Sequence, residues 1–342
     1  MAELPSDGLQ VALEVAGIAG TPASIEERAA ALLEPLRRVV PFQGVWLGLL
    51  DPDSGAHTLL VNQGHDHRIT DWLTSPAAVA EIEKLGLHRP RPPMRLRDVP
   101  VAPTELRSWV ECLWPAGFRE TLGVPLFTPD GRHLGQLGMH TDTAAHPPEA
   151  ARNLIGLLAP LLGHAVDPLR SIIAAARIVR GATAGVVLTR AGHPLPLPGL
   201  GVHPLLVEGS ALLAVATRLA AGREHVVFLC PLAGPPASTG HVHVTVLRCA
   251  ERLPHHLVAV VILAPPGDLR GLTRRELEVL GLLVEGSTNA RIAATLVIAP
   301  RTVAAHMEHI LAKLPADTRA LAAVRAQGQG LYVPPGLTSI RL

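Results

Sequence analysis

The sequence is poor in aromatic residues and in lysine. Aromatic residues make up 3% of the 342 residues, so the hydrophobic cores must be built mainly from Leu, Val and Ala. Arg outnumbers Lys by 28 to 2, and Ala, Pro, Gly and His are plentiful. A GC-rich coding genome explains this bias, so the 17 histidines need no functional explanation.

Cysteines and long apolar runs are also scarce. The three cysteines, Cys112, Cys230 and Cys249, are odd in number and widely spaced, so they suggest neither a disulfide framework nor a C-x-x-C pair. The first ten residues lack the basic and apolar segments of a secretory signal. The apolar run at residues 257–266 is too short to span a bilayer. We therefore expect a cytoplasmic protein with no membrane contact.

Catalytic and metal-binding patterns are lacking as well. We find no Ser/His/Asp set, no paired carboxylates at meaningful spacing and no phosphate-binding P-loop, so we predict neither an enzyme nor a cofactor. His241 and His243 lie on one face of an expected strand, followed by Cys249, His255 and His256. Structural zinc sites need four firm ligands, and this group does not supply them, so we predict no metal site.

The C-terminal region has clear helical periodicity. Pro300 suits the first turn of a helix because its missing N–H would be unpaired there. Val303, Met307, Ile310 and Leu314 then recur at i, i+4, i+7 and i+11, which predicts one apolar stripe of an amphipathic helix. The opposite face carries two alanines and a glutamate. A helix that reads DNA would usually carry Lys or Arg at these positions.

Two shorter helices are expected before this one. Thr273-x-x-Glu276 is a capping box at the start of an apolar helical pattern that stops at Gly286, a residue suited to a left-handed C-terminal cap. Thr288 can cap a short helix whose buried side includes Ile292 and Leu296. Helix, turn, short helix, tight turn and longer helix together predict a helix-turn-helix unit.

Residues 272–326 resemble the LuxR-type domain, also called GerE or NarL-type, of bacterial transcription factors. The matching segments include "LTRRELEVLGLLVEG", "APRTV", "KL" at 313–314 and "TRALA". The resemblance implies a four-helix domain, here 268–330, whose third helix enters the major groove of double-stranded DNA. It also implies that the fourth helix forms a homodimer.

The resemblance also implies roles for single residues. Ala304, Ala305 and Glu308 take positions that usually read bases, while Thr302 and Lys313 match phosphate-contacting positions. The full set of expected DNA-binding residues is Thr288, Asn289, Arg301, Thr302, Ala304, Ala305, Glu308, His309, Lys313 and Arg319. The sequence departs from the family at Ala299, Arg291 and Pro315, where Ser, Glu and Gly are usual.

Charge is consistent with a DNA-binding end of the chain. Residues 272–342 hold eight Arg or Lys against five Asp or Glu, whereas the whole chain has a net charge of +1. Basic residues therefore concentrate where phosphates are expected. Two alternatives stay open: a helical module that never meets DNA, and a Glu308 that pairs with an Arg of the same protein.

The N-terminal region has an α+β pattern. A helix is expected at 24–40, opened by the capping box Ser24-x-x-Glu27, and two hairpins follow, with turns at Pro-Asp-Ser-Gly and Thr-Pro-Asp-Gly. A helix starting near Pro148 closes the pattern. Helix, hairpin, irregular middle, hairpin and helix resemble the GAF sensor fold over residues 20–166.

The resemblance to GAF domains implies a small ligand between the sheet and the irregular middle. That middle, residues 66–117, holds three of the four tryptophans, so a pocket lined by Trp72, Trp109 and Trp114 is one interpretation. The alternative is that they fill a small core. A Pro-rich cluster of Arg89, Arg91, Arg95 and Arg97 is either a solvated loop or an anion site.

Residues 170–265 form a third region. A helix leads to four strand-like runs separated by Gly and Pro turns, with a helix at about 209–221 between the first two runs. The order β, α, β-β-β resembles a PAS-like domain. We therefore expect a cytoplasmic DNA-binding transcription regulator with GAF-like, PAS-like and all-α LuxR-type domains and an unknown small-molecule effector or partner. The alternative is a ligand-sensing or scaffold protein that uses its C-terminal domain only to dimerise.

Overall fold

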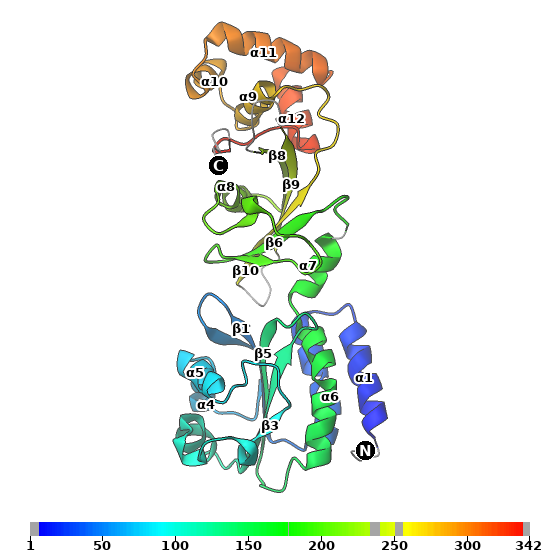
Figure 1. Ribbon diagram of the computed structural model, residues 1–342, viewed down its shortest axis with the longest axis vertical. Helices are drawn as coiled ribbons and strands as arrows, with labels where there is room; N and C mark the ends of the chain where they lie inside the picture. Colours follow the sequence, from blue (N-terminus) through cyan, green and yellow to red (C-terminus); the bar gives the residue numbers. More distant parts are fainter. Residues whose placement is uncertain (1–6, 177, 233–239, 250–255, 338–342) are drawn as a thin grey trace. The chain divides into compact units, whose positions relative to one another are not determined.

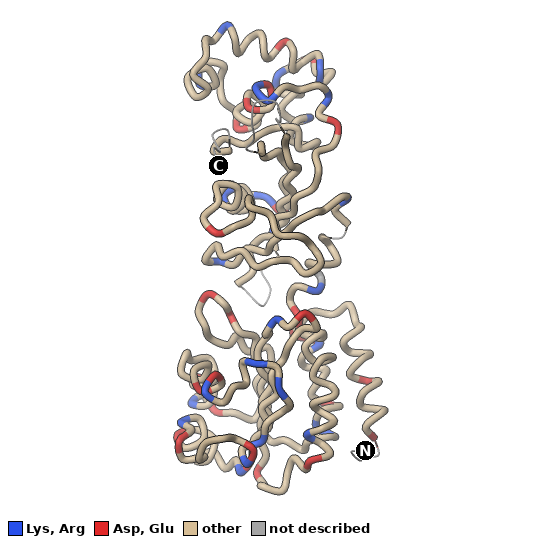
Figure 2. Tube along the Cα trace, viewed as in Figure 1, with Lys and Arg blue, Asp and Glu red and all other residues tan. Residues whose placement is uncertain are grey.

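The computed structural model of the chain describes residues 7–176, 178–232, 240–249 and 256–337 (Figure 1). The chain divides into two compact units, the first formed by residues up to Arg170 and the second beginning at Ser171. Figure 2 shows that few charged residues lie on the strands of either unit and that most lie on helices and loops. Both units are therefore built around apolar sheets.

The first unit contains one antiparallel sheet of five strands. These are β1 (Gly44–Asp51), β2 (Ala56–Gln63), β3 (Met94–Arg95), β4 (Glu120–Phe127) and β5 (His133–Thr141), in the order β2-β1-β5-β4-β3. Strands β1 and β2 pair as one hairpin and β4 and β5 as another. Both hairpins predicted from the turn sequences are confirmed.

Four helices pack on one face of this sheet (Figure 1): α1 (Gly8–Gly20), α2 (Ile25–Ala31), α3 (Leu33–Val39) and α6 (Glu149–Val166). The capping box at Ser24 and Glu27 is present. The predicted single helix at 24–40 is broken at Leu32, because Pro35 has no N–H to donate to the carbonyl of Ala31. Helix α1 was not predicted, and it packs against α6.

The chain between β2 and β4 covers the opposite face of the sheet. It forms α4 (His67–Leu73), α5 (Pro76–Lys84), the short 3-10 turns η1 (Leu96–Asp98) and η2 (Pro103–Glu105), and the π-helical turn η3 (Ser108–Leu113). A separate hydrophobic cluster around Trp46 and Trp109 lies on this side. The predicted sequence of helix, hairpin, irregular middle, hairpin and helix is therefore confirmed.

The second unit begins with another antiparallel sheet of five strands. After α7 (Leu169–Ala176) come β6 (Ala184–Thr189), β7 (Pro194–Pro196), β8 (His225–Pro231), β9 (His241–Arg248) and β10 (Leu257–Ala264), in the order β7-β6-β10-β9-β8. The turn η4 (Pro204–Leu206) and helix α8 (Ala211–Ala220) lie between β7 and β8. The predicted strands and helix are present, and the short strand β7 is an addition.

Four helices complete the second unit: α9 (Arg274–Val284), α10 (Asn289–Leu296), α11 (Pro300–Lys313) and α12 (Arg319–Gln329). One continuous cluster of buried residues runs from the second sheet and α8 into all four helices. The segments expected as separate domains at 170–265 and 268–330 thus share a hydrophobic core.

None of the helices described is long and apolar enough to cross a membrane. Within the described ranges, no three His, Cys, Asp or Glu side chains are grouped as metal ligands would be. His255, one of the histidines considered from the sequence, lies outside the described residues.

Candidate nucleic-acid interface

The start of α9 is tied to the end of α11 through one buried carboxylate. Glu276, 2% exposed, accepts from the backbone N–H of Thr273 at 2.7 Å, which completes the predicted capping box. The Lys313 ammonium lies 2.7 Å from the same carboxylate. Burial would raise the pKa of Glu276, but the hydrogen bonds from Lys313 and Thr273 outweigh it, so the pKa lies below its ordinary value.

The turn between α10 and α11 carries backbone strain. Thr288 caps α10 by accepting from the N–H of Arg291, as expected. At the other end Val297 has φ 53°, in the left-handed region, where a β-branched side chain is unfavourable. Ala299 precedes α11 and supplies no side-chain cap. The lost Ser cap is therefore a real departure from the family pattern.

Helix α11 has the two faces that its sequence predicts. Val303, Met307 and Ile310 are buried beneath it. Arg301, Ala304, Ala305, Glu308 and His309 are exposed, and Thr302 is partly buried. The two alanines at the centre of this exposed face have short side chains. The helix backbone can therefore approach another surface closely at that point.

A family model described as "Bacterial regulatory proteins, luxR family" matches residues 270–326. These residues form a LuxR-type helix-turn-helix domain. The transcriptional regulatory protein LiaR of Bacillus subtilis is 49% identical over 55 residues, which cover 16% of this chain and 26% of that protein. The DNA-binding transcriptional activator DevR/DosR of Mycobacterium tuberculosis is 44% identical over 68 residues, covering 20% and 31%. The chain thus spans about a quarter to a third of the length of these curated relatives.

The basic residues expected at phosphates in the LuxR-type domain differ in how they are held. Arg301 is exposed, and no ion pair or hydrogen bond joins its guanidinium to another described residue. Lys313 is bound to Glu276. Arg319 donates through Nη2 to the carbonyl oxygen of Ser287 at 2.7 Å. Lys313 and Arg319 therefore hold the domain together whether or not they also reach a phosphate.

Three further expected contact residues lie at the start of α10 and within α11. Asn289 is the first residue of α10. His309 Nδ1 lies 3.7 Å from Glu276 Oε1, so its ring is turned toward α9. Glu308 has no ion pair with an arginine in the described part of the chain. The pairing considered as an alternative for Glu308 is absent from these ranges.

Helix α12 has a buried side and an open side. Ala322 and Ala326 are buried, and the helix packs on α9 and also on β8. Leu321 is only partly buried against the shared core, whereas Val324 is 66% exposed. Val324 is therefore a large apolar side chain that the fold leaves open on α12.

The segment after α12 attaches the LuxR-type domain to the second sheet. Leu229 of the edge strand β8 donates to the carbonyl oxygen of Tyr332 at 2.8 Å, and Val333 donates to the carbonyl oxygen of Leu277 at 3.1 Å. A Cβ on Gly281 would lie 1.8 Å from the Val333 oxygen. Glycine in the middle of α9 thus lets this segment lie against the helix. Sequence reasoning missed this contact, although a glycine inside a helical pattern was its signal.

A cavity of about 100 Å³ lies in the first unit. Trp72 and Trp109 line it together with Trp46. Trp46 and Trp109 are also buried in a hydrophobic cluster against which Trp72 packs, so the same side chains fill a small core. Trp114 does not line it: its side chain is 52% exposed and lies 4.1 Å from the Arg119 guanidinium. Trp46 was missed because it lies on a strand outside the irregular middle, where only period-two alternation could have placed it on the cavity face.

The arginine cluster beside this cavity is already engaged. Arg95 pairs with Asp98 and with Glu149, both at 2.7 Å, and Arg97 pairs with Glu120 at 2.8 Å. Arg91 donates to the carbonyl oxygen of Leu85. Arg95 and Arg97 are thus engaged by carboxylates, which does not favour an anion site. Arg89, Arg91 and Arg97 are exposed, as the solvated-loop interpretation expects.

A solved structure that overlaps this chain is the GAF domain of a phosphoenolpyruvate-protein phosphotransferase from Coxiella burnetii. It is 18% identical, with a TM-score of 0.38, and the alignment covers 49% of this chain and 97% of that chain.

Proposed function

We propose that this protein is a DNA-binding transcription regulator in which α11 enters the major groove. The observation that carries the proposal is the exposed face of α11 within a LuxR-type domain. Arg301 at the start of that face is a free cation for a phosphate. Phosphate contacts of this kind supply affinity and fix the position of the helix, while base contacts supply specificity.

At the centre of α11 the side chains suit few direct base contacts. Ala305 can contact a thymine methyl group, and Glu308 can accept from a cytosine amino group. Ala304 permits close approach of the helix. The remaining specificity would come from DNA shape and deformability. Thr288, Asn289, Thr302, His309, Lys313 and Arg319 complete the proposed interface.

The proposal is tested by titrating DNA with the full chain at several salt concentrations. The full chain is needed because the LuxR-type helices share their core with the second sheet. Arg301→Ala should weaken binding to every sequence and lower the salt slope by about one. Binding that is absent at low salt would favour the alternative of a helical module that never meets DNA. A slope unchanged by the substitution would show that Arg301 contacts no phosphate.

Specificity has its own test at Glu308. Glu308→Ala should reduce discrimination at one base pair by about 1–3 kcal/mol and leave the others unchanged. Arg291→Ala, at an exposed position of α10, is a control that should alter no base preference. If Glu308→Ala instead raises affinity equally for all sequences, the carboxylate only repels DNA and reads no base.

The second part of the proposal is a homodimer through α12. Its support is the open side of the helix, where Val324 is exposed and a partner helix could pack closely on small residues. Val324→Glu should yield monomers in sedimentation and weaken binding to a site with two half-sites. Equal sedimentation of both proteins, with equal DNA affinity, would leave α12 as a core helix only.

The two sheets are proposed as a GAF-like sensor at 20–166 and a PAS-like domain at 170–265. Their support is the order of elements and, for the first, a cavity between the sheet and the irregular segment. A small-molecule effector in that cavity would bias the state of the DNA-binding helices. The scaffold alternative predicts that ligands in the cavity leave DNA affinity unchanged.

A further inference from the structure

The cavity has a floor built from alternate residues of β5. Gln136, Gly138 and His140 lie on the sheet face opposite α6, and Gly138 pairs with Trp46 of β1. A Cβ on Gly138 would lie 2.1 Å from Trp46 Nε1. Only glycine therefore lets the indole lie across this strand, where it forms an aromatic wall of the cavity.

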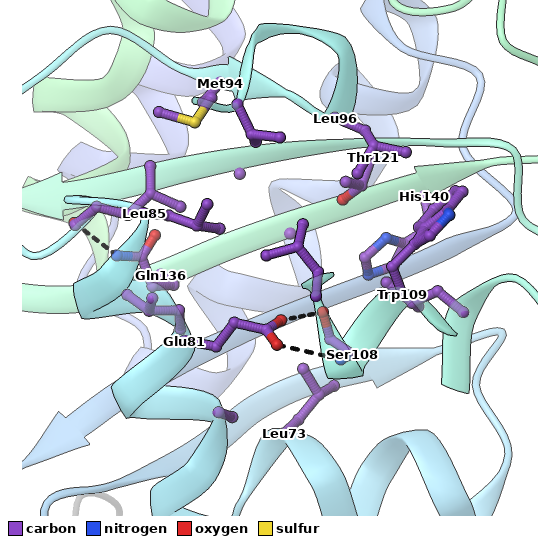
Figure 3. A pocket seen from close by; sticks show the side chains of 18 of the residues that line it. Leu73, Glu81, Leu85, Met94, Leu96, Ser108, Trp109, Thr121, Gln136 and His140 are labelled. Atoms are coloured by element: carbon purple, nitrogen blue, oxygen red, sulfur yellow. Dashed lines mark hydrogen bonds between the residues drawn. The ribbon is translucent and has the colours of Figure 1, made fainter. Parts of the chain in front are cut away.

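Two buried polar side chains on this floor have unused hydrogen-bonding atoms (Figure 3). Gln136, 2% exposed, donates through Nε2 to the carbonyl oxygen of Leu87 at 2.8 Å, while its Oε1 has no partner in the structure. His140, 4% exposed, has no partner at either ring nitrogen. Burial holds the pKa of His140 well below its ordinary value, so the ring is neutral and offers one donor and one acceptor.

The charged groups in the lining are Arg95 and Glu81, and both have partners. Arg95 binds Asp98 and Glu149. The Glu81 carboxylate accepts from both the backbone N–H and the hydroxyl of Ser108 (Figure 3). Among the lining residues, all of them described, the atoms left for a ligand are thus neutral. An anion would lose its hydration without gaining a counter-charge, because Arg95 is already paired. A cation would meet only the Glu81 carboxylate, whose two oxygens already accept from Ser108.

The size of the cavity limits the ligand to about one ring. A volume of about 100 Å³ is smaller than the roughly 150 Å³ of an apolar cavity that holds benzene. Gln136 and His140 are four residues apart on an extended strand, about 13 Å between Cα atoms. They therefore mark opposite ends of the floor, with Trp46 between them.

We propose that the cavity binds an uncharged, ring-sized molecule with an O–H or N–H group that donates to Gln136 Oε1. The ring lies between Trp46 and Trp109, and its far edge faces His140. This inference rests on the proposed function, because it names the chemical class of the effector proposed for the same cavity.

The test uses three probes of nearly the same shape: phenol, toluene and the N-methylpyridinium cation. Calorimetric titration into the full chain should show binding of phenol, binding of toluene about fivefold to tenfold weaker for want of a donor, and none of the cation. Gln136→Met keeps the side-chain length and removes the acceptor, so it should erase the preference for phenol. Gln63→Met, at an exposed position at the end of β2, is the matched control and should keep that preference.

Three outcomes would overturn the proposal: binding of the cation at least as tight as that of phenol, a preference for phenol unchanged in Gln136→Met, or no binding of either neutral ring. Binding of the cation would instead indicate an aromatic cation site. Should Gln136→Met fail to fold, the three probes decide on the wild-type protein alone. A DNA titration of the same preparation separates the claims, because phenol binding without DNA binding refutes the regulator and leaves the ligand class standing.

Discussion

The two sheets of this protein have the same strand order and use their surfaces differently. In chain order, the strands of each sheet are arranged 2-1-5-4-3, and their neighbours are antiparallel. In the first sheet the chain between the second and fourth strands stands over one face and leaves a cavity. In the second sheet the edge strand β8 hydrogen-bonds to the segment that follows α12 of the LuxR-type domain. The two sheets therefore share a topology. The chain that covers the first sheet leaves a cavity, and the edge strand of the second sheet binds another segment of the chain.

Tryptophan gives a direct way to test this difference, because all four tryptophans precede residue 171. Tryptophan fluorescence follows unfolding of the first unit only. Far-UV circular dichroism follows both units, and the single tyrosine, Tyr332, lies in the second. A substitution confined to one unit should therefore separate the two signals during urea unfolding.

The largest effect is expected from Gly281→Ala, which breaks the attachment of the second sheet to the helices. Its new methyl group would overlap the backbone oxygen of Val333. A backbone atom cannot turn away as the end of a flexible side chain can. We expect a loss of about 3 kcal/mol in the free energy of unfolding of the second unit, seen by circular dichroism and not by tryptophan fluorescence. Gly328→Ala, in α12 with nothing within 4 Å, should be neutral or stabilising. Equal melting of the two variants would contradict the close contact.

The two lysines of the chain allow the next comparison, one in each unit. Lys313→Met should cost about 2 kcal/mol because it leaves the buried Glu276 carboxylate without its cation. Lys84→Met should cost little, since Lys84 and Glu105 form an exposed pair at 3.7 Å. The measurement is urea unfolding followed by circular dichroism.

The pH dependence of Glu276 follows from its lowered pKa. A carboxyl group with a lower pKa in the folded state stabilises the protein at pH above its ordinary value and loses that contribution as the pH falls below about 4.5. In Lys313→Met this loss between pH 5 and 3 should shrink. A wild-type stability that does not fall over that range would show that Lys313 contributes nothing to the charge balance.

In the first unit, the substitution that corresponds to Gly281→Ala is Gly138→Ala. Here the new methyl group meets the indole of Trp46, a side chain that can turn. We therefore expect a smaller cost, about 1.5 kcal/mol, together with a changed tryptophan emission spectrum. A cost as large as that of Gly281→Ala would mean that Trp46 is held as rigidly as a backbone.

The smallest effect is expected at the turn between α10 and α11. Val297→Gly should stabilise the second unit by about 1 kcal/mol, because glycine adopts the left-handed backbone without the clash of a β-branched side chain. Val324→Gly, at an exposed position inside α12, should instead destabilise it by about 1 kcal/mol. If both substitutions destabilise equally, Val297 is not strained.

Local signals determined most of the elements. Capping boxes at Ser24 and Thr273, turn sequences in the hairpins and the apolar period of α11 each depend on residues a few positions apart, so the sequence alone predicted them. The same holds for the exposed face with Arg301, Ala305 and Glu308, because helical periodicity fixes which side chains share a face. The break in the helix expected at 24–40 also has a local cause, Pro35, which the sequence shows directly.

Tertiary structure decided what depends on residues far apart in the sequence. That Trp46 and not Trp114 lines the cavity depends on β1 lying beside β5, which no short segment encodes. That Lys313 is bound to Glu276, 37 positions away, depends on how α9 and α11 pack. The contact of Val333 with Gly281 lies where the regions expected as separate domains, 170–265 and 268–330, share one hydrophobic core. Periodicity and capping are set by the bonds of one segment, whereas such contacts are set by burial shared between segments, and only the folded chain reveals which segments share it.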